Sequence, residues 1–202
     1  MTDTRLNLPR PRSSGPVSVE EALLRRRSHR EYGPRPLRLA EIGQILWAAY
    51  GVTSPQGYRT APSARALFPL GIYTVASEVE DVVPGLYRYD ASEHVLELRL
   101  PGDWREGMYE TTFEQECIRR APAVLVITAD KTKCREAFGD SWERYAAMDV
   151  GHVGQNIHLQ AEALGLGTVV VCAFRPKPLE ELLELPSAEV PLYLMPVGAK
   201  KE

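Results

Sequence analysis

The sequence lacks the patterns that tie small proteins together covalently or around a metal. Its three cysteines, Cys117, Cys134 and Cys172, form no CxxC pair, which argues against a disulfide framework or a cysteine zinc site and favours core thiols. The four histidines form no HExxH motif and no i, i+4 pair, and His152 and His158 would lie about 600° apart on a helix. We therefore expect no metal site.

Long apolar runs and the common nucleotide-binding signatures are also missing. No run approaches the roughly 18 residues of a membrane span, and the N-terminus lacks the apolar segment of a signal peptide, so we expect a cytoplasmic protein without membrane contact. There is no GxGxxG, no GxxxxGK[ST] and no GxSxG motif. Rossmann, Walker and serine-hydrolase sites are not supported.

The net charge of the whole chain is small, but positive charge is concentrated near the N-terminus. The net charge of -3 argues against a general nucleic-acid surface, which would depend on phosphate neutralisation. Residues 1–38, however, hold nine arginines and four acidic residues, a local charge of +5 that leaves -8 for the remainder. This distribution favours a compact cationic site for one anionic ligand.

What the sequence does contain predicts one folded domain, residues 17–202, preceded by a flexible arm, residues 1–16, that orders, if at all, on a partner surface. About a quarter of the 202 residues are Leu, Ile, Val or Phe, enough for a packed core. A capping box at Ser18 to Glu21 starts the first helix. Periodicity and breakers predict helices at 19–27, 39–50, 103–120, 140–164 and 178–185, and strands at 70–76, 85–90, 94–99, 123–128, 167–173 and from 192. Without regular βαβ alternation, this order favours an α+β fold.

The helix at 140–164 indicates a partner chain. It is apolar nearly all round, with a stripe of small residues at Ala147, Gly151 and Gly154. Such a helix is buried on every side, and a chain of this size rarely encloses it alone. Within it, His152 favours a core histidine over a catalytic base.

Two segments are candidates for a site. Residues 26–30 place Arg26 and Arg30 four apart around Ser28, a set that can bind a phosphate through charge-assisted hydrogen bonds. The alternative is that these arginines complement a helix dipole and stay solvated. Residues 62–65, in the long loop before a strand, could wrap a flat ligand or form a simple turn.

Taken in order, the motifs resemble the FMN-dependent nitroreductase superfamily, and within it the SagB-type dehydrogenase branch. The matching segments are 26–32 (RRSHREY), 45–51 (ILWAAYG), 61–70 (APSARALFPL), 121–127 (APAVLVI), 149–156 (DVGHVGQN) and 163–167 (ALGLG). The resemblance implies a three-layer sandwich, with a central mixed, mostly antiparallel sheet flanked by helices. It also implies an intertwined homodimer with two shared FMN sites.

The resemblance also implies roles for individual residues. Arg26, Ser28 and Arg30 would contact the FMN phosphate and the pyrimidine edge of the flavin, with Arg27 as a fourth candidate. From the other subunit, the flavin would be packed by Pro62, Ser63 and Ala64. The backbone amides of Cys172 and Ala173, at a strand end, would lie over the flavin and donate towards N5. Lys200, a cation near the C-terminus, would reach the phosphate.

The implied activity is ping-pong hydride transfer from NAD(P)H, through flavin N5, to a flat electron-poor acceptor of quinone or nitroaromatic type. No side chain is assigned as catalytic. Arg65 and Cys172 stand where relatives usually have glycine, and no Lys-Tyr pair of the azoline-oxidising members is matched, although Tyr109 and Lys131 are testable. A dehydrogenase that tailors azoline or other modified-peptide substrates, and a non-catalytic flavin-binding module, remain as alternatives.

Overall fold

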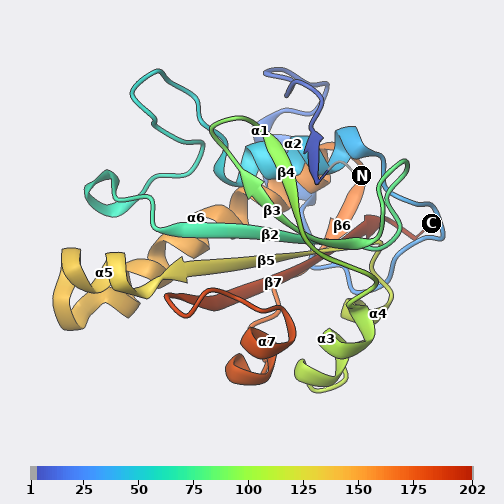
Figure 1. The fold of residues 1–202 in the computed structure, drawn as a ribbon. Coiled ribbons are helices and arrows are strands. Elements are labelled where there is room, and N and C mark those ends of the chain that lie inside the picture. The colour runs from blue at the N-terminus through green and yellow to red at the C-terminus, as the bar shows by residue number, and fades with distance from the viewer. Residues whose placement is uncertain (1–3, 202) are drawn as a thin grey trace.

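A seven-stranded sheet forms the centre of the protein. The structure is a computed structural model that describes residues 4–201. In the strand order β1-β4-β3-β2-β5-β7-β6, every pairing between named strands is antiparallel (Figure 1). The strands are β1 (Arg5–Asn7), β2 (Leu70–Ala76), β3 (Gly85–Asp90), β4 (Val95–Pro101), β5 (Ala123–Asp130), β6 (Leu166–Thr168) and β7 (Glu189–Ala199).

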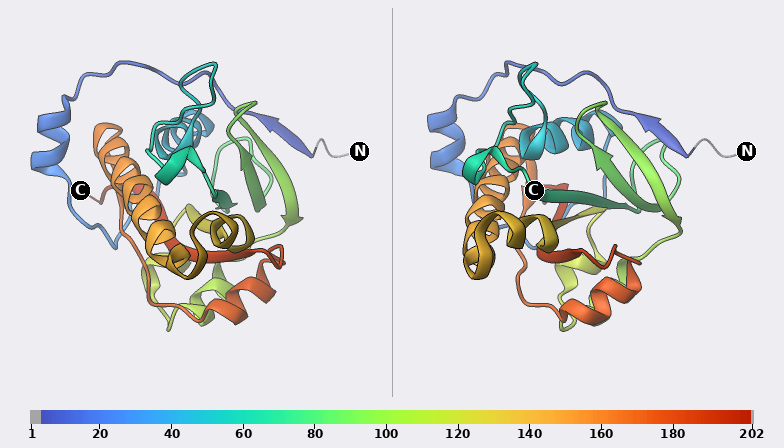
Figure 2. Two further views of the ribbon diagram at one scale, coloured as in Figure 1. Left: turned by 90° about the vertical axis from the view of Figure 1, so that its left-hand side faces the viewer. Right: turned by 60° about the vertical axis from the view of Figure 1, so that its left-hand side comes forward.

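Helices cover both faces of this sheet, which confirms the predicted three-layer α+β sandwich. On one face lie α2 and the long α6, and on the other α3, α4 and α7; α1 lies beside α6 (Figures 1 and 2). The helices are α1 (Val19–Arg25), α2 (Leu39–Tyr50), α3 (Arg105–Thr111), α4 (Glu116–Arg119), α5 (Lys131–Phe138), α6 (Trp142–Ala163) and α7 (Pro176–Leu182), with the 3-10 turns η1 (Ala64–Ala66) and η2 (Gly139–Ser141).

Strand β5 shows why the core has two halves. Its first seven residues are all buried, as expected for a continuous apolar run in a central strand. Successive side chains point to opposite faces of a strand, so Leu125 and Ile127 join the cluster under α2 and α6, whereas Val124 and Val126 join the cluster on the other face. The sheet is therefore covered on both sides, as its composition requires.

The single chain leaves one side of helix α6 uncovered, in line with the expectation that a chain of this size does not enclose this helix alone. Its core face includes Val150, Val153 and Ile157, all at most 2% exposed. Met148, however, is 53% exposed, and Ala147, His152 and Gln155 are exposed with it. An added Cβ at Gly151 would meet no atom within 4 Å. One strip of α6 is therefore open, and His152 is a surface residue rather than a core histidine.

Residues 5–12 are attached to the body of the same chain, contrary to the expectation of an arm that orders only on a partner. Strand β1 pairs with β4, with Leu6 opposite Leu96, and Leu8 is 8% exposed. Further along, the backbone N–H of Arg12 donates to Oε1 of Gln44 at 2.8 Å. Alternation is too short in these residues to predict a strand, and β4 supplies the missing hydrogen-bond partners.

Three other elements differ from the sequence-based expectation. The helix expected over 103–120 is broken into α3 and α4, because Phe113 and Glu114 adopt left-handed φ angles of 54° and 60°. The strand expected over 167–173 ends with β6 at Thr168, and only an isolated bridge from Val171 to Leu194 follows. Helix α5 was not predicted; it begins where Asp130 accepts a hydrogen bond from the N–H of Lys133. No helix within residues 4–201 is both long and apolar enough to cross a membrane.

Candidate functional site

The segment after α1 is held against the edge strand β6 and lines an open cavity. Ser28 forms a parallel bridge with Thr168, and the N–H of His29 donates to the Thr168 carbonyl at 2.9 Å. A Cβ at Gly167 would lie 2.8 Å from the Cβ of His29, so glycine permits this approach. The cavity has a volume of about 490 Å³ and is lined by Ser28, His29, Arg30, Glu31 and Lys201.

A tyrosine fixes the far end of the same segment. The hydroxyl of Tyr32 donates towards the carbonyls of His29 and Pro196, at 3.2 and 3.3 Å, and the ring packs over Gly198. Burial raises the pKa of Tyr32 far above its ordinary value, so the phenol stays protonated. Segment 28–32 is thus anchored on β6 at one end and on β7 at the other.

The cations of this segment have different environments. Arg26 and Arg30 form no ion pair within residues 4–201, and Arg26 is half-buried whereas Arg30 is exposed. Arg27 instead folds back, and its Nη1 donates to the carbonyls of Leu24 and Arg26 at 3.0 and 2.8 Å. Two guanidinium groups therefore remain available to an anion, and the third completes the end of α1.

Lys200 is already neutralised by a carboxylate that the sequence did not indicate. Its Nζ donates to both oxygens of Glu162, at 2.7 Å each, and the Glu162 side chain is only 8% exposed. The next residue, Lys201, lines the cavity and pairs with Glu31 at 2.9 Å. A phosphate would have to compete with Glu162 for Lys200.

Two buried polar atoms behind the segment have no hydrogen-bond partner among the described residues. They are Nδ1 of His158, a residue that is 7% exposed, and Oγ1 of Thr168, which is 1% exposed. Burial, together with the positive charge of Arg26 and the nearby His29, lowers the pKa of His158 to about 4. Unpartnered buried polar groups are rare in proteins and call for an explanation such as a missing ligand or water.

Residues 62–64 contact α6 at Asp149, away from the segment that contains Ser28 and Arg30. Ser63 Oγ donates to Oδ2 of Asp149 at 2.6 Å. Lys200 binds the same helix at Glu162, which is 13 residues, or about 20 Å of helix, further along. The structure therefore brings together Ser28 and Arg30 at one cavity but leaves Pro62, Ser63 and Ala64 apart from them in the single chain.

The residues that follow β6 form a third group. Cys172 and Ala173 are exposed, and the Ala173 carbonyl accepts a hydrogen bond from Nε2 of Gln115 at 3.0 Å. Burial raises the pKa of the Cys172 thiol, so the thiol is not activated as a nucleophile.

The residues singled out as departures from the family lie away from these groups. Arg65 turns to the last turn of α5, where its Nη1 donates to the carbonyl of Ala137 at 3.0 Å. The ring of Tyr109 lies 4.3 Å beneath the guanidinium of Arg119, and Lys131 begins α5. The structure does not bring Tyr109 and Lys131 together at the candidate site, where they could act as general bases.

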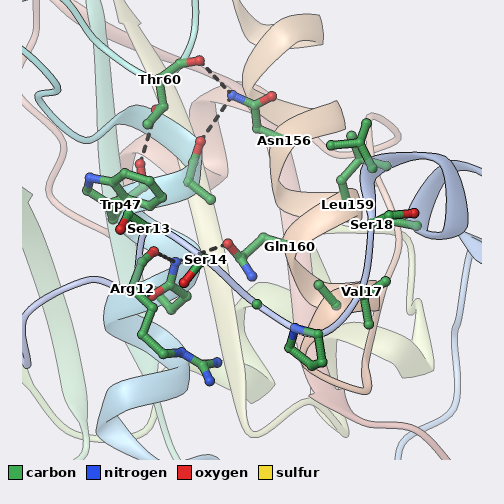
Figure 3. A pocket seen from close by; sticks show the side chains of 17 residues that line it. Arg12, Ser13, Ser14, Val17, Ser18, Trp47, Thr60, Asn156, Leu159 and Gln160 are labelled. Carbon is green, nitrogen blue, oxygen red and sulfur yellow. Dashed lines mark hydrogen bonds between the residues drawn. The ribbon is translucent and has the colours of Figure 1, made fainter.

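A second cavity of about 390 Å³ lies under residues 12–19, between α2 and α6 (Figure 3). Trp47 and Leu159 contribute apolar surface, and the amide of Asn156 is held by the carbonyls of Ala48 and Thr60 at 3.0 and 3.2 Å. Arg12 is the only charged residue in its lining. The cavity is therefore less suited to a phosphate than the one beside Arg30. Among the described residues no cluster of His, Cys, Asp and Glu could hold a metal ion.

Comparison with known proteins assigns the fold and the motifs to one family. The pattern of the Nitroreductase family matches residues 23–199, and the chain belongs to this family of oxidoreductases. A protein of Methanocaldococcus jannaschii, provisionally named a nitroreductase, is 42% identical over 186 residues, which cover 92% of this chain and 93% of that protein.

Solved structures agree with this assignment. A crystal structure from Ralstonia eutropha JMP134, also provisionally named a nitroreductase, superposes with a TM-score of 0.88 at 32% identity and covers 99% of this chain and 91% of its own. The NADPH:FMN oxidoreductase of Vibrio harveyi, solved with NAD+, has a TM-score of 0.66 at 21% identity, over 91% of this chain and 69% of its own. At that identity the second likeness concerns the fold alone.

Proposed function

We propose that the protein is an FMN-dependent NAD(P)H oxidoreductase, whose phosphate-binding segment is residues 26–30. The observation that carries the proposal is that Arg30 lines an open cavity together with Ser28, while Arg26 lies two positions before Ser28 in the chain and neither arginine forms an ion pair within residues 4–201. Charge-assisted hydrogen bonds from guanidinium and hydroxyl groups are the usual means of binding a phosphate.

The residues present fit a phosphate at this place. Adding a dianion beside Arg26 and Arg30 would supply the missing counter-charge. The unpartnered Nδ1 of His158 lies behind the same segment, close enough to Arg26 for its pKa to respond to that charge. The bound flavin supplies the capacity to accept and release a hydride, and the protein supplies binding, orientation and electrostatics.

A homodimer would bring the separate groups of one chain together with those of a partner. The open strip of α6, around Met148 and Gly151, has the small and apolar side chains that permit close approach of a second helix. In α1, Leu23 and Leu24 are 52% and 74% exposed. We propose that these surfaces pair between two copies, so that residues 62–64 of one copy complete the site at residues 26–30 of the other.

Within such a site each group of residues has a different task. Arg26, Ser28 and Arg30 hold the phosphate and place positive charge near the flavin, with Lys200 joining only if it leaves Glu162. Residues 62–64 form a wall of small side chains against the flavin. Backbone groups at Cys172 and Ala173 line the remaining side. None of these side chains is a general acid or base, so we assign no catalytic residue.

The electron acceptor we propose is a flat, electron-poor molecule of quinone or nitroaromatic type, reduced after NAD(P)H has left the same face. Within the family, the quoted motifs favour the SagB-type dehydrogenase branch. Azoline oxidation is the weaker proposal because Tyr109 and Lys131 lie apart from the site.

Two measurements test the proposed function. The absorption spectrum of the purified protein between 300 and 550 nm, followed by chromatography of the heat-released chromophore, should show FMN. Steady-state assays with NADH, NADPH and a quinone should then show turnover. A protein that stays colourless and takes up no added FMN would refute the proposal, whereas bound FMN without turnover would favour a non-catalytic flavin-binding module.

A further inference from the structure

The loop that contains residues 62–64 is tied to α6 at two places, by the amide of Asn156 at Thr60 and by the buried carboxylate of Asp149 at Ser63 and Ala64. Ser63 Oγ donates to Oδ2 of Asp149 at 2.6 Å, and the N–H of Ala64 points to Oδ1 at 3.4 Å. Asp149 is 4% exposed and forms no ion pair with any residue between 4 and 201. Its hydrogen-bond partners in this part of the chain therefore both belong to the loop.

The same loop has an unfavourable backbone conformation. Arg65, Ala66 and Phe68 have φ angles of 57°, 53° and 48°, although none of them is glycine. Left-handed φ angles in non-glycine residues cost free energy and persist only where surrounding contacts impose them. Such strain is commonly found where a protein holds a functional segment in place.

The hydrogen bonds of Ser63 connect the carboxylate to this strained turn. While its hydroxyl donates to Asp149, its Oγ accepts the N–H of Phe68 at 2.9 Å. Ser63 thus links Asp149 on α6 to the last left-handed residue of the loop. From outside the loop, the Ala137 carbonyl also accepts a hydrogen bond from the exposed Arg65 side chain, and the Tyr50 ring packs edge-on against Phe68 with the ring centroids 6.2 Å apart.

We propose that Asp149 is a positioning residue for the cofactor site, which fixes residues 62–64 in the conformation that forms the flavin wall of the partner's site. The proposal rests on the proposed function, because it assumes that this loop contacts the flavin. Asp149 itself is buried and would not touch the cofactor. A carboxylate suits the role because it accepts from Ser63 and Ala64 at once, whereas an asparagine would turn an N–H₂ group towards one of these donors.

The test compares four variants of the full-length protein: Asp149→Ala, Asp149→Asn, Ser63→Ala and, as a matched control, Asp140→Asn, which alters an exposed carboxylate. The measurement is the dissociation constant of FMN and of riboflavin for the apoprotein, from flavin fluorescence, with the visible spectrum of the bound flavin as a second readout.

Because the wall faces the flavin ring rather than the phosphate, Asp149→Ala should raise the dissociation constants of FMN and riboflavin by the same factor, at least tenfold. It should also broaden the absorption spectrum of the bound flavin. Asp149→Asn should lie between Asp149→Ala and the natural protein, since it retains an acceptor for Ser63. Ser63→Ala should show the same equal loss for both ligands, and Asp140→Asn should bind as the natural protein does.

The results separate the two hypotheses. If the natural protein binds neither flavin, the proposed function fails and this inference fails with it. In another outcome the natural protein binds FMN, while Asp149→Ala and Ser63→Ala bind both flavins with unchanged affinity or lose affinity for FMN alone. Either result would show that the positioning role is wrong, and the proposed function would stand. Should Asp149→Ala not fold, Ser63→Ala decides the question by the same measurement.

Discussion

Replacement of Arg26 by alanine is the sharpest test of the phosphate site. The backbone N–H of Arg26 completes α1 by donating to Ala22, and alanine keeps this bond. The Arg26 side chain makes no ion pair within the described residues, so its removal should leave the free energy of unfolding of the apoprotein nearly unchanged. Its effect should therefore appear in FMN binding alone.

The magnitude follows from the half-buried position of this guanidinium. A hydrogen bond to a charged group contributes about 1.5–3 kcal/mol, which corresponds to a roughly 10- to 150-fold increase in the dissociation constant of FMN. The increase for Arg30→Ala should lie at the lower end of this range, because Arg30 is exposed and its charge is screened by salt. Riboflavin, which lacks the phosphate, should lose less affinity than FMN in both variants.

Arg27→Ala is the matched control, because this guanidinium is turned onto the carbonyls of Leu24 and Arg26. It should change FMN affinity less than threefold. The assay is a fluorescence titration of apoprotein with FMN at two salt concentrations. Equal affinities for Arg26→Ala and the natural protein, or a larger loss for Arg27→Ala, would refute the assignment of the phosphate site.

Three further predictions concern stability and assembly. Although burial opposes it, hydrogen bonds from Arg35 and Arg38 lower the pKa of Glu41 to about 2, so Glu41→Gln should lose about 1–3 kcal/mol of unfolding free energy at pH 7. Because a lowered carboxyl pKa stabilises only above the unfolded value, this difference should shrink as the pH falls from about 4.5 to 2 in urea denaturation. Met148→Glu should place a charge on the open strip of α6 and yield monomers in light scattering, and an unchanged dimer would contradict that interface. Gly198→Ala should destabilise the protein by about 1–3 kcal/mol in thermal unfolding, because its Cβ would lie 2.7 Å from the ring of Tyr32.

The elements that the sequence predicted well are those whose pattern is local. Helix α2 and strand β2 have the predicted bounds, 39–50 and 70–76, since periodicity and a following breaker define them. Helix α5 escaped prediction because it is only eight residues long and mostly polar, with Cys134, Ala137 and Phe138 as its only apolar residues. The break after α3 depends on two left-handed residues that no local signal marks.

The candidate site divides in the same way. The cluster of arginines around Ser28 could be predicted from the sequence because these residues are adjacent in the chain. The structure brings Ser28 and Arg30 to one cavity. The capture of Lys200 by Glu162 joins residues 38 positions apart and depends on how β7 lies against α6, which sequence spacing does not contain. The link from Ser63 to Asp149 spans 86 positions, although both residues lie in segments that resemble the family.

The short strands at the two ends of the sheet limit how copies of this protein can associate. Each outer strand, β1 and β6, has only three residues, and they cover the longer strands β4 and β7. An unpaired long edge would offer a row of free backbone groups to any neighbouring strand, a route to unspecific aggregation. With both edges shortened, a second copy has few backbone groups to pair with. The homodimer that we propose would therefore form through the helical surfaces, where side-chain shape selects the partner.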